Sequence, residues 1–202
     1  MNVAIIGCGG MGGLHAGMAS NCGLKIVACG DAKLSNAKAL ADQDTADASD
    51  DCTAVIARSD VDIVGIMTPT PTHARYVVAA ARAGKHIFCE KPFARTVAQC
   101  REAIAAAKKA RVKLFVAHVV RYFQEFEAIR AQVAAGKIGK PGFVKLYRGG
   151  IFPMGAGGWF RDYAQSGGAT MDHTVHAEDS FQVIQLRHSL RGRCLALGTL
   201  AV

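Results

Sequence analysis

Val3-Ala4-Ile5-Ile6-Gly7-Cys8-Gly9-Gly10-Met11-Gly12 is the stretch that decides the fold. Its first four residues form a short apolar run, which is typical of a strand buried on both faces. Three glycines with the spacing GxGxxG follow, and then comes a helical stretch that ends at Gly23. The spacing alone is a weak signal in a chain with 22 glycines. A glycine turn that directly follows a strand and opens a helix is a strong indication of a dinucleotide site.

There is a physical reason for glycine at each of these positions. Gly7 permits the tight turn, Gly9 lets the backbone approach a pyrophosphate, and Gly12 lets the helix pack closely on the strand. The helix N-terminus then presents N–H groups and the positive end of its dipole to the phosphates. We therefore predict that these glycines, together with Met11, line a cofactor site. A plain strand–helix turn is the alternative.

An acidic residue follows the second expected strand, which spans residues 25–30. Asp31 comes 19 positions after Gly12, where dinucleotide-binding proteins place the acid that binds the adenosine ribose hydroxyls. This favours NAD as the cofactor, because a carboxylate repels a 2′-phosphate. Lys33 is close enough that NADP is possible as well. Asp31 can also serve as a helix N-cap.

Strands and helices alternate through the next part of the chain. Thr70-Pro71 is expected to start a helix, since threonine can cap and proline fits the first helical position. Thr96 and Gln99 form a capping box, whereas residues 42–60 show no clear pattern. The alternation predicts an α/β fold with a Rossmann-type, doubly wound parallel sheet. Further strands are expected at 62–67, 86–89 and 113–120, and helices at 33–41, 70–84, 96–110 and 125–135.

The pattern changes after the first 120 residues, and we place a domain boundary near Arg121. The remainder predicts a strand at 143–147, a glycine-rich loop at 149–158 and a helix at 177–185. These few elements cannot bury a sheet face, so residues 121–202 are expected to form an incomplete α+β second domain. The tail at 187–202 is basic and atypical, which suggests a truncated or frame-altered product.

Composition and charge exclude several classes of protein. The formal net charge is +8, but the basic residues form no dense run and do not alternate with aromatic residues, so we expect no nucleic-acid partner. The seven cysteines contain no CxxC pair, which argues for reduced thiols and against a metal site. The absence of a long apolar run argues against a membrane span. The absence of a basic n-region at the start of the chain argues against a signal peptide. We therefore expect a cytoplasmic protein.

Three later segments, taken with the glycine turn, resemble the Gfo/Idh/MocA family of oxidoreductases. They are DIVGIMTPTPTH at 62–73, GKHIFCEKP at 84–92 and GGATMDHTVH at 167–176. The stretch GGWFRD at 157–162 looks most like the inositol 2-dehydrogenase branch of this family. The resemblance extends from the first residue to about residue 186, and Glu-Lys-Pro is its most specific mark.

The resemblance implies a set of cofactor-binding residues. Thr68, Pro69, Thr70 and His73 match the loop that the family places along the cofactor ribose and nicotinamide. Glu90, at the start of the Glu-Lys-Pro segment, is assigned to the same cofactor site. With the glycine turn, these residues would hold the nicotinamide at the ends of the strands.

The resemblance also implies the groups that act on the substrate. Lys91 matches the active-site lysine, Asp172 and His176 match the catalytic pair, and Arg121 matches an arginine beside the substrate. His176 is a natural base because imidazole titrates near neutral pH. Asp172 would share a helix face with it and orient it, and Lys91 would stabilise alkoxide charge. Alternatives are a surface lysine, a core histidine, a capping aspartate and an arginine paired with Glu125.

The predicted function is hydride transfer between NAD and a secondary alcohol of a cyclitol or sugar. The partners would be a small-molecule polyol or sugar and, if the second domain were complete, further copies of the chain. Two alternatives are open: a dinucleotide-binding protein without catalysis, and a reductase of an imine or tetrapyrrole. The latter would have no particular use for Asp172 with His176.

Overall fold

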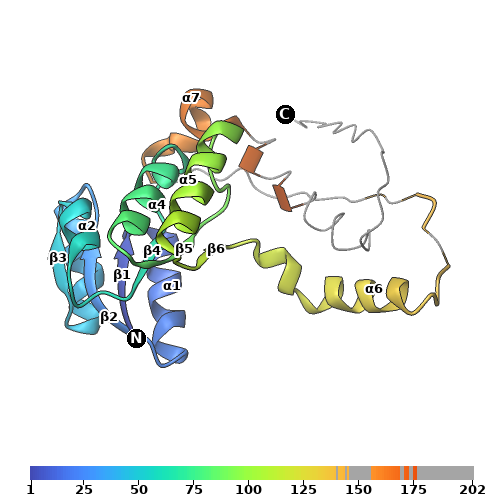
Figure 1. Ribbon diagram of the computed structural model, residues 1–202, viewed down its shortest axis with the longest axis horizontal. Coiled ribbons are helices and arrows are strands. Elements are labelled where there is room, and N and C mark those ends of the chain that lie inside the picture. The colour runs from blue at the N-terminus through green and yellow to red at the C-terminus, as the bar shows by residue number, and fades with distance from the viewer. Residues whose placement is uncertain (140, 144, 146–155, 169–170, 173–174, 177–202) are drawn as a thin grey trace. The chain divides into compact units, whose positions relative to one another are not determined.

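The computed structural model describes residues 1–139, 141–143, 145, 156–168, 171–172 and 175–176. The chain divides into two compact units, Met1–Ala117 and His118–Val202. The first unit contains a parallel sheet covered by helices, as expected from the alternation in the sequence (Figure 1).

The sheet has six strands in the order β3-β2-β1-β4-β5-β6, and all neighbours are parallel. This is the order found in dinucleotide-binding folds, in which the chain moves outward from the centre in both directions. In chain order the strands are β1 (Asn2–Ile6), β2 (Lys25–Gly30), β3 (Asp47–Ser49), β4 (Ile63–Ile66), β5 (His86–Cys89) and β6 (Leu114–Val116).

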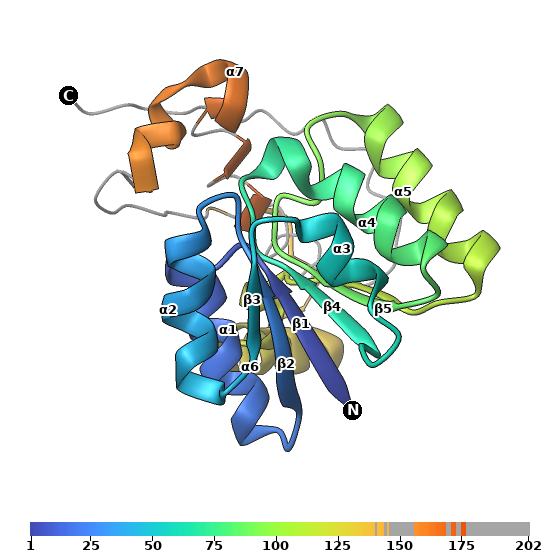
Figure 2. The same ribbon diagram turned by 90° about the vertical axis from the view of Figure 1, so that its left-hand side faces the viewer.

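Helices cover both faces of the sheet, which explains why its central strands are apolar after their first residues. On β1, Val3 and Ile5 pack on one side with α1 and α2, while Ala4 and Ile6 pack on the other with α3, α4 and α5 (Figure 2). Successive side chains of a strand point to opposite faces, so a doubly covered strand needs apolar residues at every position. The helices are α1 (Gly10–Asn21), α2 (Leu34–Asp44), α3 (Cys52–Ala57), α4 (His73–Arg82) and α5 (Val97–Ala110).

Local signals in the sequence mark several helix ends correctly. The hydroxyl of Thr96 accepts a hydrogen bond from the backbone N–H of Gln99, and the Gln99 side chain accepts one in return, which completes the predicted capping box. Gly84 follows α4 with φ of +72°, and Gly23 follows α1 with φ of +71°. Glycine adopts this left-handed conformation without strain, so it ends a helix readily.

Three stretches of the chain differ from what the sequence indicated. Residues 42–60, which showed no clear pattern, contain the end of α2, the strand β3 and the helix α3. Asp51 caps α3 by accepting hydrogen bonds from the N–H groups of Thr53 and Ala54. The strand expected at 113–120 is only three residues long, and a 3-10 turn follows it.

The third difference concerns the start of the helix at Thr70. Thr70–Thr72 forms a 3-10 turn, η1, and α4 begins only at His73. Pro71 lies at the beginning of this turn, but no side chain caps it. The Thr72 hydroxyl is instead bonded to the Thr68 hydroxyl at 2.7 Å and the Pro69 carbonyl at 2.8 Å. The Thr72 hydroxyl therefore forms hydrogen bonds within the loop and does not cap the helix.

The second unit is described only in part. Helix α6 ends before Gly136, as predicted, and none of its residues is buried. The expected strand at 143–147 and loop at 149–158 fall mostly outside the described residues, and the expected helix at 177–185 falls there entirely. The described elements are η2 (Val119–Tyr122), α6 (Gln124–Ala134), η3 (Ala156–Arg161) and α7 (Tyr163–Ser166).

The contact between α1 and β1 predicts opposite effects for two glycines of the same helix. A Cβ atom on Gly12 would overlap the carbonyl oxygen of Gly7, whereas one on Gly17 would meet no atom within 4 Å. Gly12→Ala should therefore destabilise the protein by about 1–3 kcal/mol through overpacking. Gly17→Ala should stabilise it by up to about 1 kcal/mol, because alanine is the better helix former.

Urea unfolding followed by circular dichroism measures both effects. Gly17→Ala is the matched control for Gly12→Ala, since it makes the same chemical change on an open face of α1. Equal free energies of unfolding for the two variants would contradict the close contact.

Candidate functional site

The predicted cofactor residues gather where neighbouring strands end. The glycine turn follows β1, Asp31 follows β2, Thr68 comes shortly after β4, and Glu90 and Lys91 directly follow β5. Because the strands are parallel, their carboxyl ends lie at one edge of the sheet. The order of strands reverses between β1 and β4, and the crevice at such a point is where open α/β sheets bind ligands.

Gly7 holds the turn tightly against the neighbouring strands. Its φ is +93°, and a Cβ atom there would lie 2.6 Å from both the carbonyl carbon of Met67 and the nitrogen of Thr68. Its N–H donates to the carbonyl oxygen of Gly30 at 2.8 Å. Any side chain would therefore push the turn away from β4, so the position requires glycine.

The start of α1 has open space around it, whereas Gly7 is crowded by the backbone after β4. A Cβ atom on Gly9 would meet nothing within 4 Å, and the Met11 side chain is 44% exposed. No side chain caps the helix at Gly9, and its first turn has no acidic residue. The first N–H groups of a helix have no acceptor within the helix. This end of α1 therefore combines space, hydrogen-bond donors and a positive dipole, which are the features that bind phosphate.

The side chain of Asp31 is held in place by backbone N–H groups at both of its carboxylate oxygens. Its Oδ2 accepts the N–H of Cys8 at 2.8 Å, and its Oδ1 accepts the N–H of Lys33, also at 2.8 Å. The Asn36 amide donates to Oδ1 at 3.3 Å. The carboxylate is thereby fixed beside the glycine turn while remaining partly exposed. Its expected role in binding ribose stays a prediction.

Cys8, within the glycine turn, points inward. Its thiol lies 3.5 Å from the carbonyl oxygen of Gly30 and packs with the core cluster that contains Cys29. A hydrogen bond between the two thiols, together with burial, raises the pKa of Cys8, and the same hydrogen bond lowers the pKa of Cys29. Cys8, which is half-buried, is thus held as a thiol that fills space.

His73 lies beneath the loop rather than on its surface. The side chain is 1% exposed, with Nδ1 2.8 Å from the carbonyl oxygen of Pro92 and Nε2 2.6 Å from that of Thr68. The ring thus links the loop after β4 to the loop after β5. Thr70 is also buried. In this structure both residues shape the loop from below, while Thr68 and Pro69 are the more accessible members of the predicted set.

Glu90 is bound by a residue that the sequence analysis missed. His15 Nε2 lies 2.7 Å from Glu90 Oε1, and the N–H of Lys91 donates to Glu90 Oε2 at 3.0 Å. Glu90 is 8% exposed, so its carboxylate acts inside the protein. Only its position on α1, one turn after Gly12, could have drawn attention to His15 in the sequence.

The other predicted substrate-site residues belong to the second unit. Arg121 is exposed on η2. Asp172 and His176 are both buried, and the described residues around them, 171–172 and 175–176, are helical. Their catalytic roles stay predictions.

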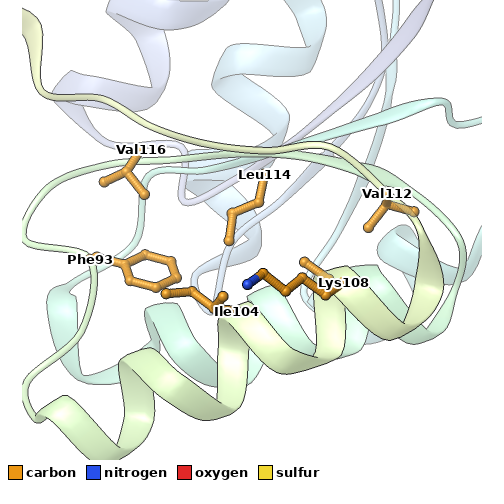
Figure 3. Close-up of a pocket in the computed structure, with 7 residues that line it drawn as sticks. Phe93, Ile104, Lys108, Val112, Leu114 and Val116 are labelled. Atoms are coloured by element: carbon orange, nitrogen blue, oxygen red, sulfur yellow. The ribbon is translucent and has the colours of Figure 1, made fainter.

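A hollow of about 390 Å³ lies elsewhere on the first unit (Figure 3). It contains no predicted site residue. Among the described residues there is also no cluster of three or more potential metal ligands, and no helix suited by length and hydropathy to cross a membrane. The hollow is lined by Phe93, Ile104, Ala107, Lys108, Val112, Leu114 and Val116.

Comparison with known families agrees with this geometry. Residues 1–118 match the model of the oxidoreductase family with an NAD-binding Rossmann fold, Gfo/Idh/MocA, and residues 126–185 match the C-terminal domain of the same family. The chain belongs to the Gfo/Idh/MocA family. The resemblance seen in the sequence and the expected Rossmann fold are thereby confirmed.

Individual relatives include a dehydrogenase and a reductase. The inositol 2-dehydrogenase of Rhizobium meliloti is 33% identical over 178 residues, which are 87% of this chain and 52% of the relative. The 1,5-anhydro-D-fructose reductase of Ensifer adhaerens is 36% identical over 126 residues, 62% of this chain and 38% of the relative. The chain thus spans about half or less of the length of these relatives.

Solved structures give the same picture. An NAD-binding oxidoreductase from Klebsiella pneumoniae superposes with a TM-score of 0.76 at 27% identity, covering 91% of this chain and 52% of that one. The likeness supports the Rossmann fold of the first unit.

The environment of His73 predicts that the stability of the first unit depends on pH. Burial lowers the pKa of His73, and the two carbonyl contacts only partly oppose it. Below a pH of about 6.5 the unfolded chain protonates this residue while the folded protein keeps it neutral. The unfolded state then binds more protons, so the free energy of unfolding should fall as the pH drops, by at most about 1.4 kcal/mol per pH unit from this group.

This pH dependence is tested by measuring the free energy of unfolding in urea at pH 7.5 and pH 5.5 for the wild type and for His73→Gln. The variant cannot titrate at this position, so it should lose less stability between the two pH values. If both proteins lose the same amount, His73 does not contribute to the pH dependence.

Proposed function

We propose that this chain binds NAD at the carboxyl edge of its sheet and takes part in hydride transfer from a secondary alcohol of a cyclitol or sugar. One observation carries the proposal. The glycine turn, the fixed carboxylate of Asp31 and the segment containing Lys91 all lie at the same edge, although they come from three separate parts of the sequence.

The described residues fit a dinucleotide. The open backbone at Gly9 leaves room for a pyrophosphate at the start of α1. The carboxylate of Asp31 is available to accept hydrogen bonds from ribose hydroxyls beside the turn. When bound, the nicotinamide would accept the hydride, because proteins supply position and charge control for this chemistry rather than the redox group.

The protein side of the reaction requires a base and a group that stabilises charge on the substrate oxygen. Lys91 would donate a hydrogen bond to that oxygen as it loses its proton. His176 would receive the proton, and Asp172 would orient the imidazole or bind a neighbouring hydroxyl. Arg121 would bind the substrate. The dehydrogenase and reductase relatives support this assignment of the reaction class.

NAD is the preferred cofactor in this proposal. A carboxylate at Asp31 would lie next to the ribose 2′-position and repel the phosphate of NADP. Both oxygens of Asp31 are held by backbone N–H groups, so the side chain cannot readily turn away. Lys33 contributes its backbone N–H to this arrangement, while its side chain is exposed.

Replacing Lys91 tests the catalytic part of the proposal. Lys91→Ala should lower NADH formation from a panel of inositols and hexoses by roughly a hundredfold or more, because one donor at the developing alkoxide is lost. The dissociation constant for NAD, measured by calorimetry, should change little. Lys109→Ala, on the exposed surface of α5, is the control.

The results also separate the competing functions. Turnover that is unchanged in Lys91→Ala would show that the lysine is not catalytic. Clear NAD binding with no turnover by the wild-type chain would favour a dinucleotide-binding protein without catalysis. No detectable binding of NAD or NADP to folded protein would refute the proposal as a whole.

Replacing Asp31 tests the cofactor preference. Asp31→Asn keeps the shape of the side chain but removes the charge, so repulsion of the 2′-phosphate should disappear. We expect the ratio of the NADP to the NAD dissociation constant to fall by about tenfold, which corresponds to about 1.4 kcal/mol. Calorimetry with both dinucleotides measures this ratio, and an unchanged ratio would show that Asp31 does not select NAD.

A further inference from the structure

The segment that carries Lys91 is fixed by contacts on its inner side. Both carboxylate oxygens of Glu90 are engaged, Oε1 with Nε2 of His15 at 2.7 Å and Oε2 with the N–H of Lys91 at 3.0 Å. From the other side, His73 contacts the carbonyl oxygen of Pro92 at 2.8 Å. The Lys91 N–H is therefore bound by Glu90, which contacts His15 of α1, and the Pro92 carbonyl is bound by His73 of α4.

His15 is itself held by aromatic packing. Its ring contacts the ring of Phe88 edge to face, with the centroids 5.0 Å apart. Phe88 lies on β5, two residues before Glu90, and stacks on Phe115 of the neighbouring strand β6 at 5.4 Å. Edge-to-face packing restricts the orientation of the imidazole, so Nε2 stays directed at Glu90.

The hydrogen bond between His15 and Glu90 is strong because its acceptor is a buried carboxylate. A carboxylate oxygen only accepts, so Nε2 of His15 must carry the hydrogen. Hydrogen bonds to a carboxylate are stronger than neutral ones, and burial strengthens them further because little water competes. Glu90 is 8% exposed and its partner is also partly buried. Without His15, the carboxylate would lose its partner on α1 and with it a fixed orientation.

We propose that His15 is a positioning residue for Lys91. It holds the Glu90 carboxylate, which in turn holds the Lys91 backbone N–H, and so sets the direction in which the lysine leaves the end of β5. Because His15 lies on α1, it also joins the helix that would bind the pyrophosphate to the segment that would act on the substrate. The importance of this position for turnover rests on the proposed role of Lys91.

Amide hydrogen exchange tests this positioning without requiring activity. In His15→Phe the ring contact with Phe88 is kept but the donor is lost, whereas His15→Gln keeps a donor at a similar distance from the backbone. Exchange of the Lys91 amide, measured by NMR on the full chain, should become at least about tenfold faster in His15→Phe. It should stay within about threefold of wild type in His15→Gln, while the amides of β1 and β4 do not change.

Either of two results with the single variants would overturn the proposal. One is wild-type protection of the Lys91 amide in His15→Phe, and the other is exchange in His15→Gln as fast as in His15→Phe. An unpaired buried carboxylate can itself unfold a protein, so the double variant His15→Phe/Glu90→Gln provides a folded comparison. Its Lys91 amide should also exchange at least about tenfold faster than in the wild type, and wild-type protection there would equally overturn the proposal.

Turnover and cofactor binding separate this inference from the proposed function. His15→Phe should lower kcat by about tenfold and leave the dissociation constant for NAD unchanged, and His15→Gln should recover most of the loss. A weakening of NAD binding as large as the loss of kcat would show that His15 acts on the dinucleotide instead. If the wild-type chain shows no turnover, the proposed function fails, and the exchange experiment still decides the role of His15.

Discussion

The close packing of the glycine turn against the backbone after β4, and of α1 against that turn, is the constraint on which the site depends. Gly7 touches the backbone after β4, and Gly12 leaves no space for a side chain against Gly7. These two contacts set the angle at which the helix leaves the sheet. That angle leaves the helix N-terminus open at the crevice. One turn further along α1, it brings His15 to the segment after β5. The same packing therefore places the proposed phosphate site and supports Lys91.

Two acidic residues at this edge have different surroundings and therefore different roles. Asp31 accepts N–H groups from the backbone and remains partly exposed, so it can meet a ligand. Glu90 is buried and bound by His15 and the N–H of Lys91. A buried carboxylate needs partners within the protein, since it has lost those in water. Glu90 thus organises the segment that carries Lys91, and the expectation that it also contacts the cofactor stays a prediction.

Much of the first unit could be predicted because its signals are local. The apolar runs of the central strands, the glycine turn and the capping box of Thr96 each depend on residues a few positions apart. Predictions failed where the backbone is organised by less regular contacts. The loop at Thr70 forms a 3-10 turn because Thr72 bonds to Thr68 and Pro69. The short strand β3 is polar, since it lies at the edge of the sheet, and shows no apolar run.

The sequence by itself determined the fold class, the glycine turn, the carboxylate after β2 and membership in an oxidoreductase family, because each is written in a short run of residues. Only the tertiary structure decided which side chains support that site. His15 and Glu90 are 75 positions apart, and His73 is 19 positions from Pro92. Parallel strands bring such distant segments to one edge. Which histidine meets which partner then depends on the packing of α1 and α4, which no local pattern encodes.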